Sequence, residues 1–271
     1  MPQQDAANSP FREFAAEAVV LAGGGTAILL QLAHPDVAAG VANHSDFVNA
    51  PMRRLWGTLD FVTAEAFGGP DEQAFVRHRV NAQHARVNGV DQRGNRYDAN
   101  DSAAQYWVAA TLCWSAVRAH RKVYGRRATS GARADAIVRE FGRMGTALRM
   151  RAHDWPRSAA EFDRRFAQQL RQLEVGEAAQ QAKTELFVAR HADWWLRMLM
   201  PVASRLAVSL LPPQIATAYG HPHTRASKFV ANLCWAPVIA AGHLLPRPIR
   251  TLPARLVLRR VRRLAAATRA G

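Results

Sequence analysis

The sequence predicts an all-α protein that forms a single helical domain. Apolar residues recur with a helical period through most of the chain. Serine, aspartate and proline residues open these segments, and glycines or prolines close them, as helix boundaries require. No run of alternating apolar and polar residues extends beyond a few positions, so no strand of ordinary length is predicted.

The composition is that of a soluble globular protein. The 271 residues are 49% hydrophobic and 21% charged, which suffices for a substantial core. Cys113 and Cys234 lie far apart within apolar helical patterns, so neither a disulfide framework nor a cysteine-rich metal site is supported. We therefore expect a reducing compartment.

Neither a secretory leader nor a transmembrane helix is predicted. Residues 1–20 lack a basic segment followed by an apolar block. The most apolar stretch, VVLAGGGTAILLQLA, is interrupted by three glycines and is shorter than the roughly 20 residues needed to span a bilayer. We expect a cytoplasmic protein.

The first helical segment begins at Ser9-Pro10, with serine as the N-cap and proline at the first helical position. The glycines at 23–25 break or bend this segment before TAILLQLA resumes, and Pro35 ends it. A dinucleotide-binding loop is excluded because the three glycines are consecutive and Ile28 occupies the position of the last glycine in that motif. We interpret the glycines as a site of bending or close helix packing.

The middle of the chain contains three further helical patterns, and Asp101 and Gly125 bound the last of them. They cover residues 51–67, 71–88 and 102–124. The segment GVDQRGNRYDAND, before Asp101 and including it, is rich in turn formers and is predicted to be a polar loop.

The second half begins with a helix after Ser130 and a helix opened by a capping box of Ser158 and Glu161. A long apolar helix then runs to about Met200. Seven prolines are expected to cut the remainder into short pieces: Pro201, Pro212, Pro213, Pro222, Pro237, Pro246 and Pro248. We expect residues 1–220 to form the helical domain and residues 221–271 to form a basic, proline-punctuated C-terminal extension.

The formal net charge of +15 comes mainly from arginine, because only three of the 36 basic residues are lysines. The one dense run is RTLPARLVLRRVRRLAAATRAG at residues 250–271. Two interpretations stay open for it, a solvated terminal helix and peripheral attachment to an anionic membrane. No aromatic residues are interleaved for base stacking, so no specific nucleic-acid binding is expected.

A histidine stands out in VRHRVNAQHARVNG, residues 76–89. On a helix, Val76, Val80, His84 and Val87 share one stripe, whereas His78 points elsewhere. His84 is either a hydrogen-bonded core residue or a ligand. No i,i+4 histidine pair with a glutamate supports zinc, and no G-x-S-x-G motif supports a serine hydrolase. The chemistry is therefore carried by a cofactor, or there is none.

Four segments, QLAHPDVAAGVANHSDF, RRLWGTLDFVTAEAFG, VNAQHARVNG and YDANDSAAQYWVAATL, point to a known family. In order and spacing the chain resembles, over roughly residues 15–220, the family of the fungal oxygenase MpaB and the bacterial latex-clearing, or rubber, oxygenases. This resemblance implies an all-α bundle with a globin-like core. It also implies haem b, and cleavage of carbon–carbon double bonds of isoprenoid chains with dioxygen.

The resemblance implies roles for individual residues. His84 matches the proximal ligand of the haem iron, where an imidazole with apolar surroundings is required. Arg54 and Thr58 match an Arg-x-x-x-Thr pair, so that the guanidinium holds a propionate or polarises bound oxygen and the hydroxyl donates on the distal side. His34 matches a His-Pro pair and Asp46 another recurring residue, each either contacting haem or substrate or securing a helix end.

Two departures from the family pattern bear on function. Ala109 stands where many relatives have histidine, and the glutamate proposed as a base in rubber oxygenases has no counterpart. The implied function is a haem b oxygenase acting with dioxygen on an apolar, isoprenoid-like small molecule. The alternatives are a non-catalytic haem or hydrophobic-ligand carrier on the same scaffold, and a basic helical protein that binds membrane or nucleic acid without a cofactor.

Overall fold

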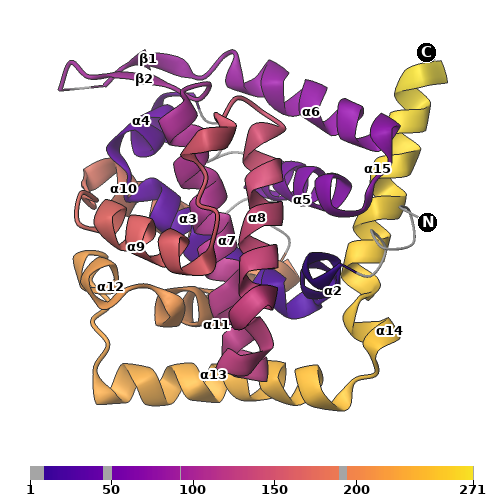
Figure 1. Ribbon diagram of the computed structural model, residues 1–271. Helices are drawn as coiled ribbons and strands as arrows, with labels where there is room; N and C mark the ends of the chain where they lie inside the picture. Colours follow the sequence, from indigo (N-terminus) through magenta and orange to yellow (C-terminus); the bar gives the residue numbers. More distant parts are fainter. Residues whose placement is uncertain (1–8, 45–50, 92, 189–193, 271) are drawn as a thin grey trace.

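The computed structural model describes residues 9–44, 51–91, 93–188 and 194–270, without the side chains of 51–54, 195–196 and 270. It confirms the all-α fold class (Figure 1). The N-terminal part consists of α2 (Pro10–Ala16), the 3₁₀ helix η1 (Ala18–Gly23), α3 (Gly24–Leu32) and α4 (Pro35–Asn43). The Ser9 side chain accepts a hydrogen bond from the Arg12 amide, which confirms the predicted N-cap.

The glycine run is a site of close packing, as predicted. A Cβ atom on Gly23 would lie 2.6 Å from the Ser115 carbonyl oxygen, and one on Gly25 would lie 2.8 Å from the Ala207 Cβ. Only glycine lets η1 and α3 approach their neighbours this closely.

The middle of the chain is a helical hairpin followed by a small sheet and a long helix. The elements are α5 (Pro51–Phe67), α6 (Pro70–His84), β1 (Asn88–Val90), β2 (Arg96–Asp98) and α7 (Ser102–Tyr124). The Asp101 side chain caps α7 and Gly125, with φ of 80°, ends it, as predicted.

The polar-loop prediction for residues 89–101 was wrong, because this segment contributes to an antiparallel β-hairpin in which Gly89 pairs with Tyr97. The Tyr97 ring is buried, and its hydroxyl accepts a hydrogen bond from the Asn43 side chain and lies 3.0 Å from His44 Nε2. These contacts attach the hairpin to α4. Because β1 begins at Asn88, α6 ends at His84 rather than near residue 88 as predicted.

The second half contains helices joined by turns and short loops, and no strand, among its described residues. It comprises η2 (Arg126–Thr129), α8 (Gly131–Thr146), η3 (Ala152–Asp154), α9 (Ala159–Leu170), α10 (Glu177–Val188), α11 (Trp194–Leu210), α12 (Pro213–Ala218), α13 (Arg225–Leu244), α14 (Arg247–Arg250) and α15 (Leu252–Ala270).

Two predicted helix breaks and one predicted cap bond differ from the structure. Pro201 lies inside α11 and Pro237 inside α13. A proline removes one backbone hydrogen bond, and neighbouring helices that pack against the same segment can offset that loss. The Ser158 side chain caps α9 as predicted, but the Glu161 carboxylate accepts from the Arg157 amide instead of the Ser158 amide.

The core lies around α7, which contacts η1, α3, α8 and α13. Trp107 of α7 is buried in this core, and the indole nitrogen of Trp107 donates to the Leu30 carbonyl oxygen of α3. The Trp107 ring stacks on Phe166 of α9 at 5.4 Å. Helix α7 is therefore the axis around which the other layers are arranged.

The arginine-rich C-terminal run is helix α15, and it packs along α5 and α6 (Figure 1). Val257, Val261 and Ala265 are buried on its inner face. The expected domain boundary near residue 220 stays a prediction, but α15 covers helices that precede that boundary.

Among the described residues, no single helix has both the length and the apolarity needed to cross a bilayer. The segments Pro10–Ala16 and Ala18–Leu32, which meet at 71°, reach that threshold only when taken together.

Candidate functional site

The α5–α6 hairpin positions the predicted cofactor residues. The two helices run antiparallel through a two-residue connection, Gly68-Gly69, and Arg79 of α6 lies 3.7 Å from the Asp60 carboxylate of α5. This ion pair joins the middle of α5 to the middle of α6. Arg54 and Thr58 belong to the first half of α5, and His84 is the final residue of α6.

His84 lies on the apolar side of α6, as its spacing predicts. Val76 is buried, and Val80 and His84 are half-buried, whereas His78 is exposed. Val87, which was predicted on the same helical stripe, lies beyond the end of α6. The half-buried ring of His84 thus stands at the boundary between apolar side chains and the surface, where an axial ligand can reach a cofactor.

Of the predicted pair on α5, the structure describes the side chain of Thr58 but not that of Arg54. Thr58 is exposed on α5, next to the exposed side chains of Leu55 and Trp56. The side chain of Arg54 lies outside the described residues, and so does Asp46. The backbone of α5 places Arg54 and Thr58 one turn apart, so both share one helix face.

His34 is the residue that precedes α4, and its ring lies 6.3 Å from the Trp107 ring. Burial lowers the pKa of His34, against the opposing charges of Asp36 and Asp101. The imidazole is therefore neutral at neutral pH. Its Nδ1 atom is buried and accepts or donates no hydrogen bond within the described part of the chain, which is costly unless a ligand satisfies it.

These features fit a haem. The group needs one neutral imidazole for the iron, an apolar wall and a few polar donors. His84 offers an imidazole, and Val76 and Val80 of α6 offer apolar side chains at the same helical spacing. The unsatisfied Nδ1 atom of His34, whose ring lies 6.3 Å from the Trp107 ring, offers a polar contact. In the ranges that the structure describes, no three His, Cys, Asp or Glu side chains gather, so a site with several protein ligands is not built there.

Asp60 connects the hairpin to α15, a role that the sequence interpretation missed. Its carboxylate is 1% exposed, accepts a hydrogen bond of 3.0 Å from Arg260 and lies 3.7 Å from Arg79. Burial raises the pKa of Asp60, while Arg260 and Arg79 act in the opposite direction. The one available signal was a single acidic residue within the apolar run LDFV.

Ala109 is part of the packed core rather than of an open cavity. It is 6% exposed on α7. A Cβ atom added to Gly145 of α8 would lie 3.5 Å from the Ala109 Cβ, so this position faces α8. A histidine here would need space that the α7–α8 contact occupies.

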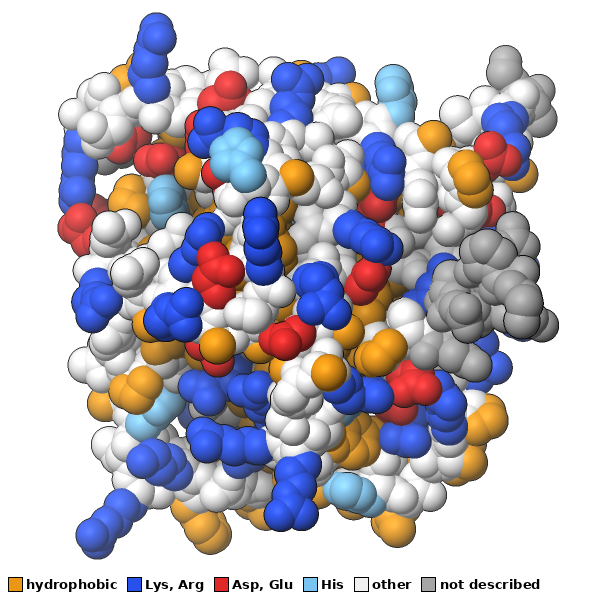
Figure 2. All heavy atoms as spheres, in the orientation of Figure 1, with side chains coloured by type: hydrophobic (Ala, Val, Ile, Leu, Met, Phe, Trp, Pro, Cys, Tyr) orange, Lys and Arg blue, Asp and Glu red, His pale blue; other side chains and the backbone are white. Residues whose placement is uncertain are grey.

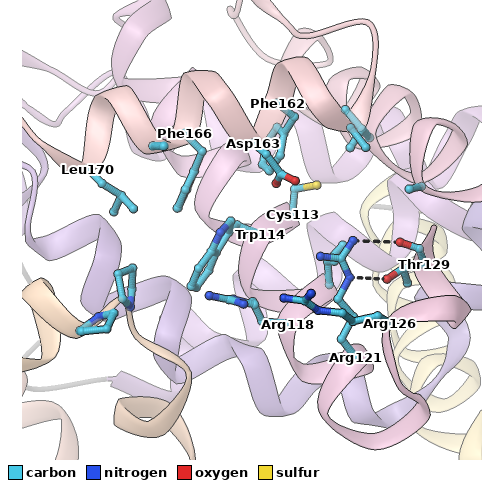
Figure 3. A pocket seen from close by; sticks show the side chains of 17 residues that line it. Cys113, Trp114, Arg118, Arg121, Arg126, Thr129, Phe162, Asp163, Phe166 and Leu170 are labelled. Atoms are coloured by element: carbon cyan, nitrogen blue, oxygen red, sulfur yellow. Dashed lines mark hydrogen bonds between the residues drawn. The ribbon is translucent and has the colours of Figure 1, made fainter. Parts of the chain in front are cut away.

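A separate cleft of roughly 330 Å³ lies beside α7 and α9 (Figure 3). Trp114 and Phe166 stack in it at 5.1 Å, and the Arg118 guanidinium lies 4.6 Å from the Trp114 ring centre. Arg121, one turn further along α7, donates to the side chain and carbonyl oxygens of Thr129. None of His34, Thr58 and His84 lines this cleft.

The cleft is cationic as well as aromatic. Arg118, Arg121 and Arg126 line it together with one carboxylate, Asp163. Although much of Arg118 is exposed, desolvation and the nearby positive charges of Arg121 and Arg126 lower its pKa, and Asp163 opposes them. Trp114, Arg118 and Arg121 follow the i, i+4, i+7 spacing of one helix face, a pattern that the sequence interpretation missed.

Comparisons with known proteins identify a family. A family model described as "ER-bound oxygenase mpaB/B'/Rubber oxygenase, catalytic domain" matches residues 11–241. Two relatives, the uncharacterized proteins Mb2261 of Mycobacterium bovis and Rv2237 of Mycobacterium tuberculosis, are each 28% identical over 152 residues. The match covers 55% of this chain and 59% of each relative, so the chain spans less than two thirds of their length. No solved structure matches the chain significantly.

Proposed function

Because the chain belongs to the mpaB and rubber oxygenase family, whose model matches residues 11–241, we propose that it is a haem b-dependent oxygenase. Its substrates are dioxygen and an apolar, isoprenoid-like small molecule. The observation that carries this proposal is the position of His84, the half-buried final residue of α6, which follows Val76 and Val80 at helical spacing.

His84 would hold the haem iron through a neutral imidazole nitrogen, and Val80 and Val87 would limit the access of water to that side. When bound, the haem supplies the oxygen chemistry. The protein contributes orientation, a water-poor wall and hydrogen-bond donors.

Thr58 and Arg54 would act from α5. The Thr58 hydroxyl would donate to a group on the distal side, and the Arg54 guanidinium would bind negative charge, either of a propionate or of reduced oxygen. The neutral His34 ring would use its unsatisfied Nδ1 atom to hydrogen-bond the cofactor or the substrate.

The experiment that tests this proposal compares His84→Ala with the matched control His78→Ala. Because His78 is exposed on another side of α6, its loss should leave the Soret band of the haem-supplemented protein nearly unchanged, whereas His84→Ala should remove or alter it. Equal spectra for the two variants would show that His84 is not the ligand. A colourless wild-type protein after haem supplementation would refute the cofactor itself.

A second candidate function is a non-catalytic carrier of an apolar ligand, and the Arg118–Trp114 cleft favours it. Stacked aromatic rings beside guanidinium groups suit a ligand with an apolar body and an acidic group. The two functions differ in turnover. Oxygen uptake that depends on an added apolar alkene supports the oxygenase, whereas long-chain carboxylate binding that is lost in Arg118→Gln, without any oxygen uptake, supports the carrier.

A further inference from the structure

The positive charge is concentrated at the C-terminal end of the chain. Residues 194–271 contain twelve arginines and lysines and no aspartate or glutamate. This leaves 24 basic against 21 acidic residues for residues 1–193, so twelve of the fifteen net positive charges belong to the last 78 residues. A surface of this kind attracts anionic partners.

Part of this charge is used inside the molecule and part is not. Arg250, Arg260, Arg262 and Arg269 pair with acidic residues of the N-terminal third. Arg225 and Lys228, in the first turn of α13, take part in none of the ion pairs that the described residues form, and neither does Arg247, just beyond its end. The two ends of α13 therefore carry positive charge available to a partner.

Helix α13 is apolar on its outer side as well as on its inner side. Its inner side buries Ala231 and Trp235 against the body of the protein. On its outer side, Phe229 is 73% exposed, Leu233 is 66% exposed and Leu244 is 81% exposed. These three positions fall within one helix face at 100° per residue and extend over about 22 Å.

Exposed large apolar side chains lie near both ends of α13. Phe229, Val230, Leu233, Leu244 and Leu245 form what we term the α13 face. In Figure 2 hydrophobic side chains protrude along the lower edge of the molecule, where Figure 1 places α13, and basic side chains lie among them. A helix that is apolar all round is normally covered on all sides, and a patch of this type marks an interaction surface.

We propose that the α13 face lies in the surface of a membrane that contains anionic lipids. The apolar side chains enter the acyl region, and Arg225, Lys228 and Arg247 contact lipid phosphates at the two ends of the helix, as in interfacial amphipathic helices. A second copy of the chain is a poorer occupant. Residues 194–271 have no carboxylate to offer, so two such faces would bring cation against cation.

The test is co-sedimentation of the full chain with phosphatidylcholine vesicles, with and without phosphatidylglycerol. The wild type should bind the anionic vesicles, and added salt should weaken binding because exposed charges are screened over about 8 Å at physiological ionic strength. Phe229→Ser/Leu233→Ser should lose at least about tenfold in vesicle affinity, since two large apolar side chains no longer enter the acyl region. Arg225→Gln/Lys228→Gln should lose affinity for anionic vesicles only.

Matched controls distinguish binding through the α13 face from non-specific binding to vesicles. Val90→Ser/Val188→Ser removes two exposed apolar side chains from β1 and α10, and Arg127→Gln/Arg139→Gln removes two exposed charges near or on α8. Both should bind vesicles like the wild type, and unchanged helical circular dichroism should show that every variant folds. The proposal is overturned if the wild type does not bind anionic vesicles or if Phe229→Ser/Leu233→Ser binds equally well. A concentration-dependent dimer that this variant abolishes, without vesicle binding, would assign the face to a second copy.

Discussion

At the scale of single residues, Thr58 distinguishes an oxygenase from a carrier. Thr58 is exposed on α5, and substitutions at exposed positions usually change stability by little. In an oxygenase, Thr58→Ala should slow alkene-dependent oxygen consumption by roughly 10²-fold while haem content changes little, because donors placed where charge develops act mainly on the rate.

The control for Thr58 is Thr184→Ala. Thr184 is also an exposed helical threonine, and its hydroxyl donates to the Gln180 carbonyl oxygen on α10, far along the chain from the predicted site. Oxygen consumption and haem content should both stay at wild-type levels. Parallel losses of haem and activity in Thr58→Ala would show that the hydroxyl serves only to retain the cofactor.

At the scale of elements, Gly23 controls the contact between η1 and α7. A methyl group at this position would meet the Ser115 carbonyl 2.6 Å away, and backbone atoms cannot move aside as a side-chain rotamer can. Gly23→Ala should therefore lower the free energy of unfolding by about 1–3 kcal/mol. Urea unfolding measures this.

The neighbouring Gly24 is the matched control. A Cβ atom at Gly24 meets nothing within 4 Å, and its φ of −59° suits any residue. Gly24→Ala should leave stability unchanged or raise it by up to about 1 kcal/mol, because alanine restricts the unfolded chain and favours helix. Equal destabilisation by both substitutions would contradict the packing role of the glycine run.

The pairing of Arg260 with Asp60 fixes α15 to the α5–α6 hairpin. Without Arg260 the buried Asp60 carboxylate keeps a single ion pair among the described residues, with Arg79 at 3.7 Å. Arg260→Gln should cost about 1–3 kcal/mol of unfolding free energy, because a buried charge loses its direct partner. Arg263→Gln, an exposed arginine on the same helix, should cost less than about 0.5 kcal/mol.

Asp60→Asn provides the converse measurement. Burial, which raises the pKa of Asp60, outweighs its two arginines, so the neutral amide should relieve part of the loss when combined with Arg260→Gln. The midpoint temperature of thermal unfolding of the double variant should then be higher than that of Arg260→Gln alone. If the two losses simply add, the arginine acts through its contact with the Trp56 ring at 4.7 Å rather than through the ion pair.

At the scale of the whole molecule, stability should fall on acidification. His120 is 5% exposed between Phe14 and Tyr124. Burial first, and then the charges of Arg133, Arg121 and Arg250, lower the pKa of His120 from 6.5 to about 4. The unfolded chain therefore takes up this proton first as the pH falls. The contribution of neutral His120 to the free energy of unfolding is fully present above pH 6.5 and is lost as the pH approaches 4.

The size of this effect is up to about 3 kcal/mol, from 1.36 kcal/mol for each pKa unit. Urea unfolding at several pH values across this window measures it in the wild type and in His120→Phe, which should show a flatter pH dependence. His78→Phe, at an exposed position, should keep the wild-type dependence. Burial also lowers the pKa of His34 and His221, so the variant retains part of the slope.

Local sequence patterns by themselves determined the helices and most of their ends. Helix periodicity and caps depend on contacts between residues one to four positions apart, and Ser9, Asp101, Gly125 and Ser158 all bound helices as predicted. The same periodicity separated half-buried His84 from exposed His78. The order and spacing of four segments identified the family, which a match over residues 11–241 then confirmed.

Only the tertiary structure decided which helix faces meet. The Asp60–Arg260 contact joins residues 200 positions apart, and the Trp114–Phe166 cleft joins two helices whose separate patterns indicate only buried stripes. Pro201 and Pro237 stay within helices, contrary to their local preference. For α13 the apolar pattern is the same on both sides, so the sequence cannot distinguish the buried Trp235 from the exposed Phe229. Burial is a property of the assembled chain, because it depends on the neighbours that folding brings to each face.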